Sequence, residues 1–342
     1  MTNRDKHNIH SLLRERILLL EGGLGTMIQG YGLTEDDFRS ERFASWEHSL
    51  RGCNDVLVLT RPDIIADIHQ KYLSAGADII STNSFNANAI SLAEYGLAEY
   101  AGEIAKRAAE VARTVAEQFT ARNPHKPRFV AGSVGPTSKS SSIATNVEHP
   151  ELREVTFEQL VDAYRVQIGG LVDGGADLIL IETIFDTLNA KAALFALHEV
   201  SHAREREIPV MLSGTLADTS GRMLSGQTVE AFYTSVAHAR PLSIGFNCAY
   251  GAKQLMPFLE RLASVSDYPI SAHPNAGLPN IEGGYDQSPE EFACEVEEYM
   301  RHGLVNIVGG CCGTTPEHIM RLSQRSGKYT PPPIPTKSHT TR

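Results

Sequence analysis

Short apolar runs recur along this chain, and each is followed by a segment with helical periodicity. The eight runs are Ile17–Leu20, Asp78–Ser81, Phe129–Gly132, Leu178–Ile181, Val210–Ser213, Ser243–Phe246, Ile270–Ala272 and Asn306–Val308. They are apolar almost without alternation, which is typical of strands buried on both faces of a parallel sheet. The helical segments are Pro62–Ala75, Leu92–Phe119, Phe157–Val172, Leu188–Val200, Val229–His238, Leu255–Ser264, Pro289–Arg301 and Pro316–Ser323. This alternation predicts a single-domain (β/α)8 barrel of the TIM type, with a doubly wound sheet as the alternative.

The barrel is predicted to occupy residues 1–326 of the 342-residue chain, followed by a tail at residues 327–342. The tail contains Pro331, Pro332, Pro333 and Pro335, which predicts a linker or a disordered end. One long irregular insertion, at residues 30–60, is acidic and then aromatic. It is interpreted either as part of a docking surface or as a packed loop.

Composition excludes several classes of protein. The chain has 31 Lys and Arg against 41 Asp and Glu, a formal charge of −10, which argues against nucleic acid and acidic membranes as partners. No apolar stretch approaches the 18 or so residues that span a bilayer, and the polar N-terminus lacks a secretory h-region. Five cysteines in this length do not resemble a secreted disulfide framework. We therefore expect a cytoplasmic protein.

Three of the cysteines are predicted to meet at one end of the barrel. Cys248 follows the sixth apolar run, and Cys311 and Cys312 follow the eighth. Active sites of these barrels lie at the carboxyl ends of the strands. Three protein ligands with an open fourth position are the pattern of a catalytic zinc, whereas a single buried cysteine is more often a small hydrophobe. Cys53 and Cys294 lie elsewhere and are given no role.

Adjacent residues of a strand point in opposite directions, so Cys311 and Cys312 can share an ion only if the chain turns sharply. The neighbouring residues Gly309, Gly310 and Gly313 allow such a turn. A zinc ion with three thiolates carries a net charge of −1 and is a poor Lewis acid, but it still deprotonates an incoming thiol. The pattern therefore indicates a thiol activator for alkyl transfer rather than a hydrolase.

These residues resemble a known family. The segment Gly309-Gly-Cys-Cys-Gly-Thr-Thr-Pro316, together with Asn247-Cys248, is similar to the zinc motif of homocysteine S-methyltransferases. Further segments resemble the N-terminal homocysteine-binding module of cobalamin-dependent methionine synthase: Glu21–Met27, Gly76–Ile80 with Thr82–Asn86, Ile181–Thr187, Ser225–Phe232, Ala272–Pro279 and Asn54–Val58.

The resemblance implies a role for each motif residue. Cys248, Cys311 and Cys312 are expected to hold Zn²⁺, and Asn275 to fill the fourth position until L-homocysteine displaces it. His273 is the alternative there, because imidazole is ordinarily a better zinc ligand than an amide. Glu182 is expected to bind the homocysteine ammonium group, the alternative being a structural ion pair.

Two further segments are placed in the substrate site by the same resemblance, Glu21–Gly23 and Ser133–Thr137. Glu21 stands where the family usually has aspartate, and its side chain is one methylene longer; Gly22 and Gly23 follow it in the same motif. The backbone amides from Ser133 to Thr137 are expected to receive the substrate carboxylate.

No donor-binding motif is found in the chain. The nearest match to the cobalamin signature Asp-x-His-x-x-Gly is Asp67-Ile-His69, with Tyr72 in place of glycine, and no second barrel is available for a folate. We therefore expect a stand-alone subunit, rather than an excised module, that receives its methyl group from methylcobalamin on a separate cobalamin- and folate-binding methionine synthase chain. The alternatives are a self-contained enzyme using S-methylmethionine or betaine, and a non-catalytic zinc- or thiol-binding partner module.

Overall fold

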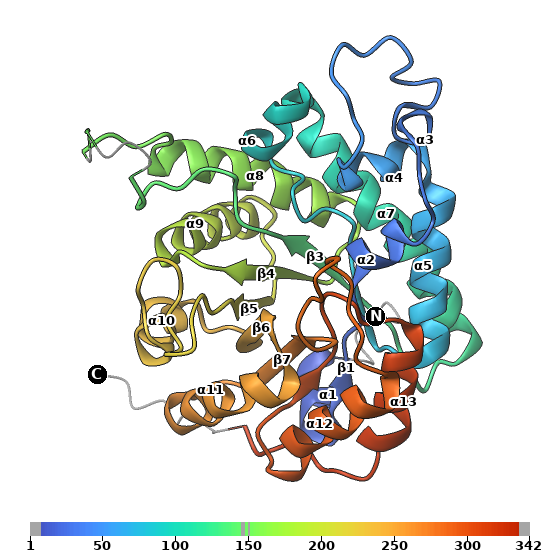
Figure 1. Cartoon of the computed structure of the whole chain (residues 1–342), viewed down its shortest axis with the longest axis vertical. Coiled ribbons are helices and arrows are strands. Elements are labelled where there is room, and N and C mark those ends of the chain that lie inside the picture. The colour runs from blue at the N-terminus through green and yellow to red at the C-terminus, as the bar shows by residue number, and fades with distance from the viewer. Residues whose placement is uncertain (1–7, 145–147, 150, 335–342) are drawn as a thin grey trace.

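Eight parallel strands form one sheet in the computed structural model, which describes residues 8–144, 148–149 and 151–334 (Figure 1). The strand order is β1-β8-β7-β6-β5-β4-β3-β2. The first and last strands of this order also meet, because Leu20 and Ile79 form a parallel bridge and Asp78 N donates to Leu19 O at 2.7 Å. The predicted (β/α)8 barrel is thereby confirmed over the doubly wound alternative. The strands are β1 (Leu18–Leu19), β2 (Ile79–Ser81), β3 (Phe129–Val134), β4 (Leu178–Ile184), β5 (Val210–Gly214), β6 (Ser243–Gly251), β7 (Ile270–Asn275) and β8 (Ile307–Val308).

Alternate residues of each strand belong to different parts of the core. Leu18 and Leu20 pack with Leu178, Leu180 and other inward-facing residues inside the barrel, whereas Leu19 belongs to the larger cluster between the sheet and the helices. This is the period-two alternation of a strand, hidden in the sequence because both faces are apolar.

The helices cover the outside of the barrel (Figure 1). They are α1 (Ile9–Glu15), α2 (Leu24–Gln29), α3 (Glu35–Arg39), α4 (Leu57–Thr60), α5 (Pro62–Ala75), α6 (Ala89–Leu92), α7 (Ala101–Arg122), α8 (Phe157–Asp173), α9 (Thr187–Ala203), α10 (Val229–Val236), α11 (Ala252–Val265), α12 (Pro289–Arg301) and α13 (Pro316–Ser326), with short 3₁₀ turns between some of them. The single helix predicted for Leu92–Phe119 is wrong at its start. Gly96 adopts a left-handed φ of 70°, and the chain makes two 3₁₀ turns before α7 begins at Ala101.

The amino ends of the strands are closed by a helix that the sequence did not predict. Ile9 and Leu13 of α1 pack against the barrel interior. At the same end Asp78 is fully buried and bonded to Arg16 at 2.8 and 2.9 Å. Beyond α13, Asn306 Nδ2 donates to Pro332 O at 3.1 Å, so the described part of the predicted tail contacts this end too, and residues 335–342 lie outside the described residues.

The insertion at residues 30–60 is packed against the barrel. Phe43 and Trp46 form edge-to-face pairs with each other and with Tyr100, and Phe43 is buried. Glu35 accepts hydrogen bonds from Leu50 N at 2.9 Å and from Arg39 Nε at 2.6 Å. These contacts favour the packed-loop interpretation over the docking surface.

No helix in the described part of the chain combines the length and apolarity needed to cross a lipid bilayer. The cytoplasmic location stays a prediction, as do the exact limits of barrel and tail.

Candidate active site

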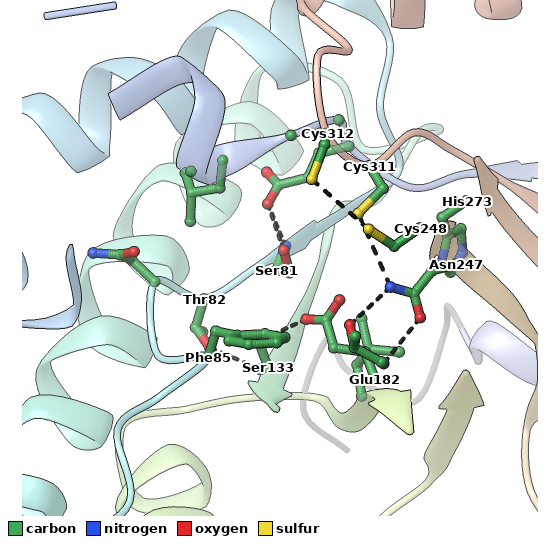
Figure 2. Close-up of a pocket in the computed structure, with 18 of the residues that line it drawn as sticks. Ser81, Thr82, Phe85, Ser133, Glu182, Asn247, Cys248, His273, Cys311 and Cys312 are labelled. Atoms are coloured by element: carbon green, nitrogen blue, oxygen red, sulfur yellow. Dashed lines mark hydrogen bonds between the residues drawn. The ribbon is translucent and has the colours of Figure 1, made fainter. Parts of the chain in front are cut away.

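The three cysteines meet at the carboxyl ends of the strands (Figure 2). Cys248 lies near the end of β6, and Cys311 and Cys312 lie in the loop that follows β8. The Sγ atoms of Cys248 and Cys312 are 3.8 Å apart, and the three sulfur atoms all lie within 4.8 Å of one another. The convergence predicted from the sequence is therefore present.

The loop after β8 turns so that adjacent cysteines face the same point. Cys311 N donates to Pro274 O at 2.8 Å, and Ala276 N donates to Cys312 O at 2.9 Å, which continues the pairing with β7 through the turn. Gly313 has a left-handed φ of 77°, and a Cβ there would lie 2.3 Å from that of Tyr285. Gly313 therefore allows the turn, as expected, and a side chain at this position would collide with Tyr285.

One negative charge is stabilised within the cluster. Hydrogen bonds from the Cys311 and Cys312 thiols lower the pKa of Cys248 to about 3. The hydrogen bonds to the Cys248 thiolate in turn raise the pKa of Cys311 and of Cys312. Because thiolates this close repel one another, ionisation of all three requires a cation between them.

Asn275 and His273 were the two candidates for a fourth ligand, and both lie buried at the end of β7. Asn275 Oδ1 accepts a hydrogen bond from Cys312 N at 3.1 Å, and its side chain also helps to lower the pKa of Cys248. His273 lines the cavity with an unpartnered Nε2, and burial lowers its pKa to about 3, so the ring is neutral. Among the described His, Cys, Asp and Glu residues, the donor atoms close enough to share one ion are those of the three cysteines, so His273 lies outside the set.

A cavity of about 300 Å³ opens beside the thiols, and Glu182 lines it from the end of β4. Its carboxylate accepts a hydrogen bond from Ser133 Oγ. The side chain keeps some exposure to the cavity, yet the surrounding protein desolvates it and raises its pKa to about 7. The neighbouring charges of Glu21 and Cys248 raise that pKa further, so the charges acting on Glu182 are negative. Such a carboxylate is suited to receive a cation.

Glu21 also lines the cavity, but its carboxylate is already bonded. Oε1 accepts from Ser81 N at 2.9 Å and from Ser81 Oγ at 2.6 Å, and Oε2 lies 3.4 Å from His69 Nδ1. Gly22 and Gly23 permit close packing: a Cβ on Gly23 would lie 2.5 Å from Cys311 O. These contacts give all three residues a structural role at the rim.

Ser133 and Thr137 are separated by the structure. Ser133 lines the cavity, and its amide donates to Thr82 Oγ1 at 2.9 Å. Thr137 lines an adjacent cavity instead, and its hydroxyl is bonded to Lys139 O and accepts from Asn189 Nδ2. The structure does not bring Thr137 to the thiol cluster.

Two residues of the site were given no role from the sequence. Asn247 belongs to the motif Asn247-Cys248 but was assigned no contact of its own. Its amide donates to Thr183 Oγ1 and is directed at Cys311 Sγ, and Figure 2 shows it beside Cys311. Tyr285 lies against Cys312: burial raises the pKa of Tyr285, and the charge of Cys312 adds to this. Tyr285 is far from the cysteines in the sequence and belongs to no recognisable motif, so nothing marked it.

Comparison with known proteins identifies a family for this chain and solved structures with a similar fold. The sequence model of a family described as homocysteine S-methyltransferase matches residues 18–326. The metallated form of the homocysteine methyltransferase MmuM from Escherichia coli is 25% identical, with a TM-score of 0.70, over 92% of this chain and 98% of that one. Its oxidised form is also 25% identical, with a TM-score of 0.69, over 91% and 96% of the two chains.

Proposed function

Because this chain belongs to the homocysteine S-methyltransferase family and is a methyltransferase, we propose that it methylates the thiol of L-homocysteine in the cavity beside Cys248, Cys311 and Cys312. The observation that carries the proposal is the convergence of three sulfur atoms next to a carboxylate that has no cationic partner among the residues that the structure describes. Homocysteine carries a thiol for the first group and an ammonium for the second.

The thiol cluster fits zinc. In a tetrahedral site with Zn–S bonds of about 2.3 Å, two sulfur atoms lie about 3.8 Å apart. The Cys248 and Cys312 sulfurs are separated by 3.8 Å, and Cys311 completes a set of three soft ligands. We propose that these three residues hold Zn²⁺ and that Asn275, packed against two of them, is the fourth ligand before substrate binds. When bound, zinc would supply the positive charge that keeps an incoming thiol deprotonated at neutral pH.

The remaining groups of the cavity orient the amino acid. Glu182 would bind the ammonium group, and Ser133 holds the carboxylate of Glu182 in place by its hydroxyl hydrogen bond. Since Glu21 is bonded to Ser81 and His69, it would act on the substrate through its charge and through the shape of the rim. Thr137 is left out of this site, because it lines the adjacent cavity.

The methyl donor divides the proposal into two forms. In the first, the protein is a self-contained enzyme that takes a methyl group from S-methylmethionine or betaine. Its support is that this chain covers 98% of the MmuM chain, so a protein of this extent carries the name homocysteine methyltransferase. In the second, methylcobalamin on a separate chain is the donor, which is supported by the motifs that resemble methionine synthase, such as Ala272–Pro279. In both, the homocysteine sulfur forms the new S–C bond while the donor leaves with the electrons of the bond that breaks.

One assay separates these forms. The purified protein, loaded with zinc, is given homocysteine with S-methylmethionine, betaine or free methylcobalamin, and methionine is measured. Saturable turnover with S-methylmethionine or betaine identifies the self-contained enzyme. Slow, unsaturable methionine formation with methylcobalamin alone, accelerated by orders of magnitude when a cobalamin-binding partner is added, identifies the second form, because docking fixes the reacting geometry. No methionine with any donor or partner would leave only the non-catalytic zinc- or thiol-binding module.

A further inference from the structure

The side-chain amide of Asn247 is buried at the end of β6 and uses all of its hydrogen-bonding capacity. Its Oδ1 accepts from Thr183 N at 2.9 Å and from Ser213 Oγ at 2.7 Å. Its Nδ2 donates to Thr183 Oγ1 at 2.9 Å and reaches Cys311 Sγ at 4.0 Å. An amide has two acceptor sites and two donor hydrogens, so these four partners fix which way the group points.

These partners connect the two halves of the proposed substrate site. Thr183 directly follows Glu182, and the pairing of β4 with β5 shifts register between Ile181 and Ile184. Thr183 has a φ of 55°, and Cys248, which directly follows Asn247, has a φ of 61°. Left-handed backbone at non-glycine residues is strained and persists only where the surroundings hold it. The side-chain amide of Asn247 bonds to Thr183 twice, accepting from its backbone N and donating to its Oγ1.

We propose that Asn247 is a positioning residue that couples the carboxylate of Glu182 to the thiol cluster. It holds the end of β4 at a fixed distance from the end of β6, and it directs an N–H toward the sulfur of Cys311. This inference rests on the proposed function, in which Glu182 binds the ammonium group of homocysteine and the thiol cluster binds its sulfur. Asn247 lies between these two groups and would fix the distance between them (Figure 2).

Only an amide satisfies all four partners. Aspartate has the same shape and could still accept from Thr183 N and Ser213 Oγ, but it would turn a carboxylate oxygen toward the sulfur of Cys311. That oxygen would repel a thiolate rather than donate to it. Alanine would remove all four bonds and leave the left-handed end of β4 without its clamp.

Asn306 provides a matched control. It is also buried and also bridges separate segments through its amide, accepting from Ile270 N at 3.1 Å and donating to Pro332 O at 3.1 Å. It lies at the amino ends of the strands, opposite to the thiols. Replacing Asn306 with alanine therefore tests the general cost of losing a buried amide in this barrel.

The experiment compares wild-type protein with Asn247→Ala, Asn247→Asp and Asn306→Ala. Zinc affinity is measured by competition with a chromophoric chelator, homocysteine affinity on the zinc-loaded protein by calorimetry, and stability by thermal unfolding. We expect zinc affinity to fall about 10- to 100-fold in Asn247→Ala, the usual effect of removing a group that orients metal ligands. Asn247→Asp should lose at least as much zinc affinity with a smaller loss of stability. Homocysteine affinity should fall in both variants, and Asn306→Ala should lose stability alone.

Zinc and homocysteine affinities that stay unchanged in Asn247→Asp would overturn the inference, as would losses in Asn247→Ala that Asn306→Ala reproduces. Should Asn247→Ala fail to fold, Asn247→Asp still decides, because it keeps two of the bonds. Wild-type protein that binds zinc tightly but forms no methionine would contradict the proposed function alone. Wild-type protein that binds no zinc would overturn both.

Discussion

Two desolvated carboxylates, at opposite ends of the barrel, are treated very differently by the structure. Asp78, at the amino ends of the strands, is bonded to Arg16 and to Leu19 N and lies 3.7 Å from Lys126 Nζ. Glu182, at the carboxyl ends, accepts a hydrogen bond from the Ser133 hydroxyl, and within the described part of the chain the charges that act on it, those of Glu21 and Cys248, are negative. Asp78 is neutralised by Arg16 and Lys126 of the protein itself, whereas the charge of Glu182 would be neutralised by a bound cationic ligand.

This difference indicates the work that each end does. A buried polar group whose partners are complete stabilises the fold, whereas one with a missing partner costs stability and is retained where a ligand supplies that partner. In (β/α)8 barrels the amino ends of the strands serve stability and the carboxyl ends serve chemistry. Substitutions at the two ends should therefore change different measured quantities.

The largest effect is expected when the thiol cluster is broken. Cys311→Ala removes one of three ligands, so zinc should fall from about one per chain to none after dialysis, and methyl transfer should be lost. Thermal unfolding should change little, because neither part of the apolar core, inside the barrel or between the sheet and the helices, includes the three cysteines. Metal analysis and calorimetry on the same samples test this, with Cys294→Ala, an exposed cysteine on α12, as the control. Stoichiometric zinc in Cys311→Ala would contradict the assignment of the site.

Glu182→Gln tests whether the carboxylate at the carboxyl ends of the strands binds the substrate. Glutamine keeps the size and the hydrogen bond to Ser133 but removes the charge that faces the ammonium group. A hydrogen bond to a charged group contributes about 1.5–3 kcal/mol, so homocysteine affinity should fall roughly 10- to 150-fold. Calorimetric titration of the zinc-loaded protein measures this, and zinc content should match that of the wild type. Unchanged homocysteine affinity would return Glu182 to a structural role.

The sequence predicted much of this arrangement because the signals are local. The eight strands follow from apolar runs, and the convergence of Cys248 and Cys311 follows because residues directly after those runs meet at one rim. Glu182 was assigned its role by the family resemblance of the segment Ile181–Thr187. The separation of Ser133 from Thr137 could not be predicted, since it depends on where the chain goes after β3.

The missed residues have the same explanation. Tyr285 reaches the cluster through a loop whose path depends on tertiary packing, and a Cβ at Gly313 would collide with it. Likewise α1 closes the barrel with two buried residues, Ile9 and Leu13, and the partly buried Leu12, which is too short a pattern to stand out.

Asp78→Asn tests the other end of the molecule. It leaves Arg16 and Lys126 without their anion, and unpaired charges near a core are destabilising. The side chain of Arg16 is 35% exposed, so water offsets part of the loss, and we expect the free energy of unfolding to fall by about 2–3 kcal/mol. Urea denaturation measures this, and zinc content and homocysteine affinity should be unchanged. If Asp78→Asn instead weakened homocysteine binding while leaving stability intact, the division between the two ends would be wrong.

The smallest expected effect is the change of ligand affinity with pH, which tests the ionisation of Glu182. Its pKa of about 7 lies above the ordinary value of 4.5, so the folded protein retains this proton more readily than the unfolded chain. Its contribution to stability is therefore largest below pH 4.5 and declines as pH rises toward about 7. Binding follows the opposite trend, because an ammonium group prefers the ionised carboxylate. We expect affinity for methionine, which has the same ammonium group but no titrating thiol, to rise about tenfold between pH 6 and pH 8. Calorimetry measures the affinity for methionine at several pH values in wild-type protein and in Glu182→Gln. The rise of affinity with pH should disappear in the variant, and an equal rise in both proteins would assign the titration to another group.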